Sequence, residues 1–141
     1  MNRRALAIAL AGGLAMLAAS PATGRGTQSG VYTTGQADEG ARIYAARCAM
    51  CHGAQLEGTV ETPGLVGKFV ANWAGRPLGN LFAYLGRAMP QNAPGTLSPE
   101  DTTALVAFIL RANGAPAGSR PLSPDAAGLG RIDFEAASLA R

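Results

Sequence analysis

The sequence is poor in the side chains on which most enzyme chemistry depends. It contains one histidine, His52, and two cysteines, Cys48 and Cys51, among 141 residues. Because His52 adjoins the cysteines, no second histidine remains to serve as the general base of a hydrolytic triad. A structural zinc site usually takes four Cys or His ligands, and only three are present. The acidic residues are scattered and give no helical pair of carboxylates for acid/base catalysis.

Charge is also scarce in this sequence. Charged residues make up 15% of the chain, and the formal net charge is +3. Hydrophobic residues make up 48%, which is enough to form a core, while 19 glycines and 9 prolines predict loop-rich connections. The length suits one domain with appendages and leaves little room for a second core.

The first 22 residues have the plan of a secretory signal peptide. Arg3 and Arg4 precede an apolar stretch over residues 5–19, and small residues follow up to Ala22. The alternative is an uncleaved membrane anchor, but the 15-residue stretch is shorter than the roughly 20 residues needed to span a bilayer. We therefore expect a periplasmic protein that is cleaved near Ala22 and has no stable membrane insertion after processing.

Removal of this segment changes the electrostatic interpretation. Without residues 1–22 the chain has 119 residues and a formal charge of +1, so its charge gives no argument for nucleic-acid binding. Residues 23–35 are rich in Gly, Ser and Thr and are expected to form a flexible N-terminal tail. Residues 119–141 are expected to form a partly ordered C-terminal extension. Its apolar residues are expected to lie against the domain: Leu122, Leu129, Ile132 and Phe134.

The two cysteines and the histidine form one motif. Cys48, Cys51 and His52 give the pattern C-x-x-C-H, which is the attachment signature of c-type haem. The spacing presents two thiols to the two vinyl groups of one haem, and the next residue offers its imidazole to the iron. A redox-active dithiol and a structural disulfide are the alternatives. However, no strand pattern precedes Cys48, and so short a loop gains little closure entropy from a disulfide.

A haem iron in an electron carrier normally has a second axial ligand, and the residue inventory limits the choice. His52 is the only histidine, so bis-histidine ligation within the chain is excluded. Outside the signal peptide the methionines are Met50 and Met89, and Met50 lies inside the attachment loop. Met89 is therefore the candidate, although a methionine after a helix is also a common filler of a core. A His/Met pair raises the reduction potential and leaves no open coordination position.

Three segments have the periodicity of helices. Residues 36–47 and 77–87 carry apolar or small side chains at helical spacing. The third segment has defined ends, because Ser98 is the expected N-cap and Asn113-Gly114 closes the helix. These segments predict an all-α fold in which helices and loops enclose one cofactor.

With the C-x-x-C-H motif ahead of Met89-Pro90, the chain resembles the class I cytochromes c over residues 36–118. The resemblance implies the cytochrome c fold, with three main helices and loops around one covalently attached haem c. It identifies residues 40–44 with the Gly-x-x-x-aromatic pattern of the family's N-terminal helix. In that pattern the glycine allows a close crossing with the C-terminal helix, here residues 104–110.

The same resemblance implies roles for three further residues. Pro63 and Leu65 match a Pro-x-Leu segment, in which the proline carbonyl accepts a hydrogen bond from the axial histidine and the leucine packs on the haem. Trp73 would donate to a haem propionate, although a tryptophan that only anchors the core or a loop also suits the sequence. The implied cofactor-binding residues are Cys48, Cys51, His52, Met89, Pro63, Leu65 and Trp73, with His52 and Met89 as the iron ligands.

A narrower resemblance concerns the partner. Trp73 and residues 81–82, 89–98 and 107–118 are similar to the cytochromes that serve periplasmic quinoprotein alcohol dehydrogenases. The implied function is that of an electron carrier, not an enzyme, which passes single electrons from a dehydrogenase to a terminal oxidase or a second cytochrome. The alternative is a tightly bound haem subunit of a dehydrogenase or oxidase complex. A gas sensor or peroxidase would need an open or labile sixth coordination position.

Overall fold

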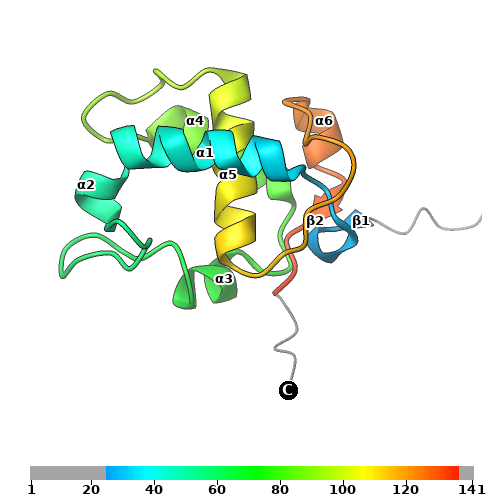
Figure 1. Ribbon diagram of the computed structural model, residues 1–141, viewed down its shortest axis with the longest axis horizontal. Coiled ribbons are helices and arrows are strands. Elements are labelled where there is room, and N and C mark those ends of the chain that lie inside the picture. Colours follow the sequence, from blue (N-terminus) through cyan, green and yellow to red (C-terminus); the bar gives the residue numbers. More distant parts are fainter. Residues whose placement is uncertain (1–24, 137–141) are drawn as a thin grey trace, which may run out of the picture.

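The computed structural model describes residues 25–136 (Figure 1). The signal peptide predicted over residues 1–22 lies outside these described residues, as do residues 137–141. Within the described part of the chain, no helix is long and apolar enough to cross a membrane.

Helices make up about half of the described residues and are the main regular elements. Their bounds are α1 (Thr34–Arg47), α2 (Ala49–His52), α3 (Lys68–Trp73), α4 (Leu78–Ala88), α5 (Pro99–Ala112) and α6 (Ala126–Leu129). A 3₁₀ helix (Thr27–Ser29) and two short strands, β1 (Arg25–Gly26) and β2 (Ile132–Asp133), complete the structure. The three helices predicted from periodicity correspond to α1, α4 and α5, and the predicted all-α class is confirmed. Helices α2, α3 and α6 have only four to six residues, too few to show a period in the sequence.

Capping residues set the ends of the two longest helices. At the start of α1, the Thr33 hydroxyl accepts a hydrogen bond from the backbone N–H of Gln36 at 3.2 Å. At the start of α5, the Ser98 hydroxyl accepts one from the backbone N–H of Asp101 at 3.0 Å, as the sequence predicted. Gly114, just after α5, has a φ of +83°, a left-handed conformation that favours glycine and ends the helix.

Helices α1 and α5 cross closely at Gly40 (Figure 1). A β-carbon added at Gly40 would overlap the backbone carbonyl of Ala104, so glycine is required at this separation. Near the crossing, the rings of Tyr44 and Phe108 pack with their centroids 5.2 Å apart. The close crossing expected at residue 40 is therefore confirmed.

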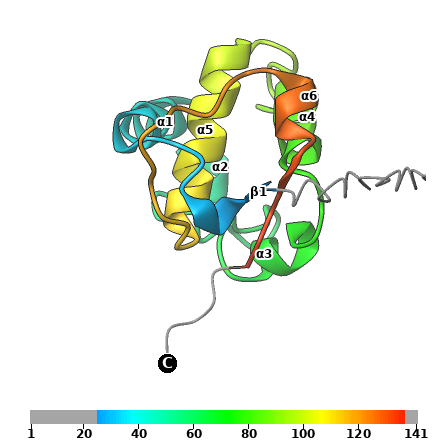
Figure 2. The same cartoon turned by 90° about the vertical axis from the view of Figure 1, so that its right-hand side faces the viewer.

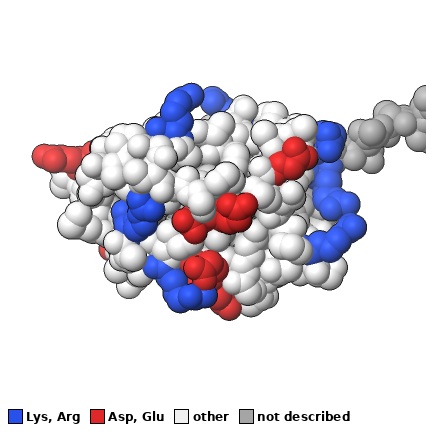
Figure 3. Space-filling view, turned by 90° about the horizontal axis from the view of Figure 1, so that it is seen from above, with Lys and Arg blue, Asp and Glu red and all other residues white. Residues whose placement is uncertain are grey.

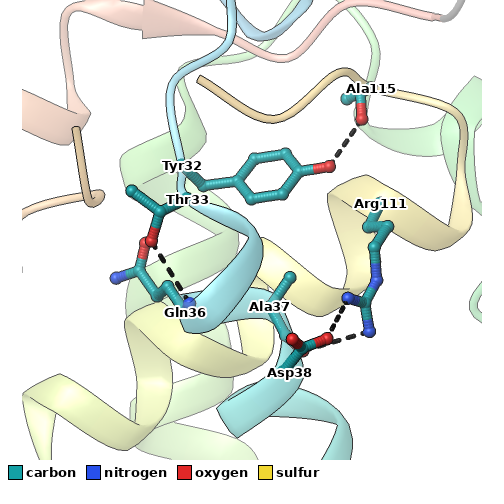
Figure 4. A network of polar contacts seen from close by, with 7 residues as sticks. All are labelled: Tyr32, Thr33, Gln36, Ala37, Asp38, Arg111 and Ala115. Atoms are coloured by element: carbon teal, nitrogen blue, oxygen red, sulfur yellow. Dashed lines mark hydrogen bonds and ion pairs between the residues drawn. The ribbon is translucent and has the colours of Figure 1, made fainter. Parts of the chain in front are cut away.

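Polar contacts join the first turns of α1 and its preceding segment to the end of α5 (Figure 4). Arg111 forms an ion pair with Asp38 and donates a second hydrogen bond to the carbonyl of Ala37 at 3.3 Å. The buried Tyr32 donates its hydroxyl proton to the carbonyl of Ala115 at 2.6 Å. Together these bonds tie the chain entering α1 to the chain leaving α5.

The segment that precedes α1 is folded, which corrects the flexible tail predicted over residues 23–35 for its described part. Thr27 and Tyr32 are buried, and β1 pairs in parallel with β2, with Arg25 beside Ile132. The backbone N–H of Glu135 donates to the Thr27 hydroxyl at 2.9 Å, across 108 positions of sequence. A composition rich in Gly and Ser does not reveal such distant partners, which is why the prediction was wrong.

The C-terminal segment folds back along the helices (Figure 2). Leu122, Leu129 and Phe134 are buried, and α6 packs against α4. The Gln36 side-chain amide donates to the carbonyl of Leu122 at 2.9 Å and accepts from its N–H at 2.8 Å. The apolar side chains lie against the helices as expected, and one hydrophobic core includes residues from Val31 to Phe134.

Candidate functional site

A cavity of about 670 Å³ lies beside α5 and is bounded by α2, α3, α4 and residues 57–66. Most of its wall is apolar, formed by Leu65, Val66, Phe69, Trp73, Leu81, Leu85, Met89, Leu97, Leu105 and Ile109. This volume falls within the range of about 300–1,000 Å³ that is typical of ligand and cofactor pockets. The structure brings all seven residues predicted to bind the cofactor to the wall of this one cavity.

The C-x-x-C-H motif forms a tight turn directly after α1. The N–H groups of Cys51 and His52 both donate to the carbonyl of Cys48, at 3.1 and 2.9 Å. This turn and the short helix α2 place both cysteines on the cavity wall, where each carries a free thiol. Cys48 is half-buried, and this burial raises the pKa of its thiol, while Cys51 is exposed. Two thiols three positions apart thus face one cavity.

The imidazole of His52 is oriented by a backbone carbonyl. Its Nδ1 lies 2.9 Å from the carbonyl oxygen of Pro63. A carbonyl oxygen can only accept a hydrogen bond, so Nδ1 carries the proton and Nε2 keeps its lone pair free. The imidazole is therefore prepared to coordinate a metal through Nε2, and its second nitrogen has the outer partner that metal-bound histidines usually have.

Leu65 belongs to the same loop and is buried in the cavity wall. Its N–H donates to the carbonyl of Leu56 at 2.8 Å, and its carbonyl accepts from the side-chain amide of Asn113 at 2.9 Å. Asn113 also donates to the carbonyl of Ile109 at 2.8 Å. Asn113 was predicted only as a helix end, but its side chain also ties the loop containing Pro63 and Leu65 to α5.

Met89 lies on the cavity wall where α4 ends. Its N–H donates to the carbonyl of Leu85 at 3.0 Å, which closes the last turn of the helix. The following loop is fixed by Thr96, whose hydroxyl donates to the carbonyl of Ala93 at 2.8 Å and accepts from Arg47 at the end of α1. The thioether is thus held by a helix on one side and an anchored loop on the other.

Trp73 closes α3 and belongs to an aromatic cluster that the sequence analysis did not predict. Its ring centroid lies 6.0 Å from that of Phe69 and 5.9 Å from that of Tyr84. All three rings line the cavity. The six residues of α3 show no helical period, so only the richness of this segment in aromatic residues could have indicated the cluster.

Tyr44, the aromatic residue of the Gly-x-x-x-aromatic pattern at residues 40–44, is a further cavity residue that was not predicted in the site. It is only 2% exposed, and its hydroxyl donates to the carbonyl of Gly53 at 2.6 Å. Burial is the main cause that raises the pKa of Tyr44 to about 12, with further increases from Cys48 and Glu57. The bond from α1 to Gly53 braces the turn that contains the C-x-x-C-H motif.

These donors fit haem c and do not fit a bare metal ion. Among residues 25–136, no group of three or more His, Cys, Asp or Glu side chains could hold a metal. The cavity instead offers a large apolar wall, two thiols, one imidazole with a free Nε2 and the thioether sulfur of Met89 at the end of α4, besides that of the exposed Met50. This combination suits a flat apolar macrocycle that is attached through two thioethers and ligated from two sides.

The helices and this donor set define a c-type cytochrome. The sequence profile of the family described as "Cytochrome C oxidase, cbb3-type, subunit III" matches residues 35–109, more than half of the 141 residues. The chain therefore belongs to this family. Its cytochrome c domain binds haem c and is an electron carrier, so the predicted fold and the predicted cofactor are confirmed.

Among solved structures, the chain is similar to one described as "Crystal Structure of the Sulfane Dehydrogenase SoxCD from Paracoccus pantotrophus". The identity is 32%, the match covers 57% of this chain and 44% of the other, and the TM-score is 0.48. The chain thus spans less than half the length of that relative. No curated protein shows a significant match.

Proposed function

We propose that Cys48 and Cys51 would attach a single haem c and that His52 and Met89 would bind its iron. The observation that carries this proposal is the contact between His52 Nδ1 and the Pro63 carbonyl, which leaves Nε2 as the free donor. Met89 is the methionine on the cavity wall that is held at a helix end, whereas the side chain of Met50 is 85% exposed.

The protein residues then act by holding and shielding the cofactor. When bound, haem c supplies one-electron chemistry between Fe(III) and Fe(II). Pro63 keeps the His52 imidazole in one tautomer and orientation, and Leu65 and Trp73 exclude water from the cavity wall. His52 and Met89 would both hold the iron and would leave no position open for a substrate, which suits outer-sphere electron transfer.

We further propose that the protein is a periplasmic carrier that takes electrons from a dehydrogenase and delivers them to an oxidase or a second cytochrome. The signal peptide predicted over residues 1–22 supports export, and the resemblance to cytochromes of quinoprotein alcohol dehydrogenases supports the donor. On the face seen in Figure 3, acidic and basic side chains are interspersed over a largely uncharged surface. Such a surface gives little long-range steering, so we expect association rates that depend weakly on ionic strength.

Stopped-flow mixing of the oxidised holoprotein with a substrate-reduced quinoprotein dehydrogenase tests the proposed donor. We expect reduction of the haem with a rate proportional to dehydrogenase concentration and nearly constant between low and moderate salt. The mass of the mature protein tests export, because processing near Ala22 removes about 22 residues. A holoprotein that the dehydrogenase does not reduce, although a small-molecule reductant does, would exclude this donor class.

A second candidate function is that of a tightly bound haem subunit, and the description of the matched family as an oxidase subunit favours it. Size-exclusion chromatography of the protein from its native membranes and periplasm separates the two functions. A free carrier elutes at the size of one small domain, whereas a subunit elutes with a larger complex that resists moderate salt.

A further inference from the structure

An aromatic contact extends from the cavity wall to the end of the described chain. Phe69, which lines the cavity, packs against Trp73 on the same wall. Phe69 also meets Phe134 edge to face, with centroids 6.3 Å apart and an interplanar angle of 74°. Aromatic pairs at such separations are favourable packing units. The ring of Phe134 therefore packs against Phe69, which is part of the cavity wall.

The backbone of Phe134 is bonded to the same wall. Its N–H donates to the carbonyl of Arg76 at 2.9 Å, and its carbonyl accepts from the N–H of Gly75 at 2.9 Å. Gly75 and Arg76 form the corner that joins α3 to α4, and the neighbouring Asp133 pairs with Pro77 at the same corner. Two backbone hydrogen bonds and one ring contact thus brace the element that carries Trp73.

The segment formed by Asp133 and Phe134 is itself fixed by burial and strand pairing. Phe134 is only 2% exposed, and β2, which directly precedes it, pairs with β1, with Gly26 beside Asp133. Phe134 lies beyond residue 109, where the match to the family ends.

We propose that Phe134 is a positioning residue for the haem site, which holds α3 so that Phe69 and Trp73 keep the cavity wall closed. The inference rests on haem c occupying the cavity. Water stabilises the oxidised form of the cofactor, which carries one more positive charge, more than it stabilises the reduced form. Solvent access and local dielectric therefore set the reduction potential, and a wall that opens lowers it.

The test compares Phe134→Ala with Leu122→Ala in the holoprotein. Both side chains are buried in the C-terminal segment, but Leu122 is tied to Gln36 at the start of α1 and not to α3. The readouts are the midpoint potential and the fluorescence of Trp73, the only tryptophan, which a nearby haem quenches. For Phe134→Ala we expect the equilibrium constant for reduction to fall by up to about tenfold, which corresponds to a midpoint potential lower by about 59 mV. We also expect the fluorescence of Trp73 to increase.

Leu122→Ala is expected to unfold more easily while its potential and emission stay at wild-type values. Phe134→Leu, which refills part of the space, is expected to give intermediate shifts, and it replaces Phe134→Ala if that variant yields no holoprotein. The proposal is overturned if the Phe134 variants lose stability alone and keep wild-type potential and emission. If the fluorescence of Trp73 is unquenched in the wild-type holoprotein, the haem does not occupy this cavity. That result would refute the proposed assignment of His52 and Met89 as iron ligands.

Discussion

Gly40 lies so close to the carbonyl oxygen of Ala104 that helices α1 and α5 leave no room for a β-carbon between them. We expect Gly40→Ala to lower the free energy of unfolding of the holoprotein by about 2–3 kcal/mol, because two helix backbones must separate to admit the methyl group. Urea denaturation followed by circular dichroism measures this loss.

Gly35→Ala is the matched control for this prediction, since it is on the same helix with no atom near the added methyl group. It is expected to be neutral or to raise the free energy of unfolding by up to about 1 kcal/mol, because alanine favours the helix. Equal losses in the two variants would show that the α1–α5 crossing does not require glycine.

The two methionines outside the predicted signal peptide provide a direct test of axial ligation. Met89→Ala is expected to abolish the Met–iron charge-transfer band, convert the haem to a high-spin form and lower its potential, because a ligand that raises the potential is lost. Met50→Ala removes an exposed side chain and is expected to leave the spectrum unchanged. A wild-type spectrum that is high-spin and insensitive to Met89→Ala would refute the assignment.

The raised pKa of Tyr44 predicts a loss of stability at alkaline pH. The phenol has an ordinary pKa of 10.0 and one of about 12 in the folded protein, so the folded state holds this proton more tightly than the unfolded state does. The contribution is fully present below pH 10 and is lost as the pH rises from 10 to about 12. Burial, the main cause, persists when Cys48 has become a thioether.

Tyr44→Phe isolates this contribution. At neutral pH we expect the variant to lose about 1 kcal/mol, since the bond to the Gly53 carbonyl is gone. Between pH 10 and 12 its free energy of unfolding should fall less steeply than that of the wild type. Parallel pH profiles for the two proteins, measured by urea titration, would show that Tyr44 does not cause the alkaline loss.

Removal of the cofactor is expected to unfold the domain. Without the cofactor, the largely apolar wall of the cavity of about 670 Å³ is exposed to water and loses its packing partner. Domains of this size are only marginally stable, so a loss on this scale removes the cooperative fold. Protein made without haem attachment should therefore lack a cooperative urea transition, with the holoprotein as the control. A cooperative transition of similar midpoint in the apoprotein would contradict this expectation.

The sequence predicted those parts of the fold that depend on residues close together in the sequence. Cys48, Cys51 and His52 are within five positions, so their shared chemistry is visible without any knowledge of the fold. Ser98 was found as an N-cap for the same reason, because its bond to Asp101 spans three positions. The place of Met89 at the cavity followed from a periodic helix that ends just before it.

The parts that were missed depend on contacts between distant residues or on helices too short to have a period. Thr27 and Glu135 are hydrogen-bonded although 108 positions separate them, and no local sequence pattern predicts that pair. Phe69 and Trp73 sit on a six-residue helix, where fewer than two turns cannot establish a face. The partner of Phe134 was likewise hidden, although its burial against the domain was expected from its apolar character.

The pairing of β1 with β2 also determines how this domain can be attached to other proteins. Arg25 lies beside Ile132, so the described chain enters and leaves at the same end of the molecule, away from α2 (Figure 1). A domain whose two ends are close together can be inserted into a surface loop of a larger protein without distorting the domain or the loop. A domain connected at this end alone would leave its opposite end, with the exposed residues Cys51 and Met50, accessible to a partner protein.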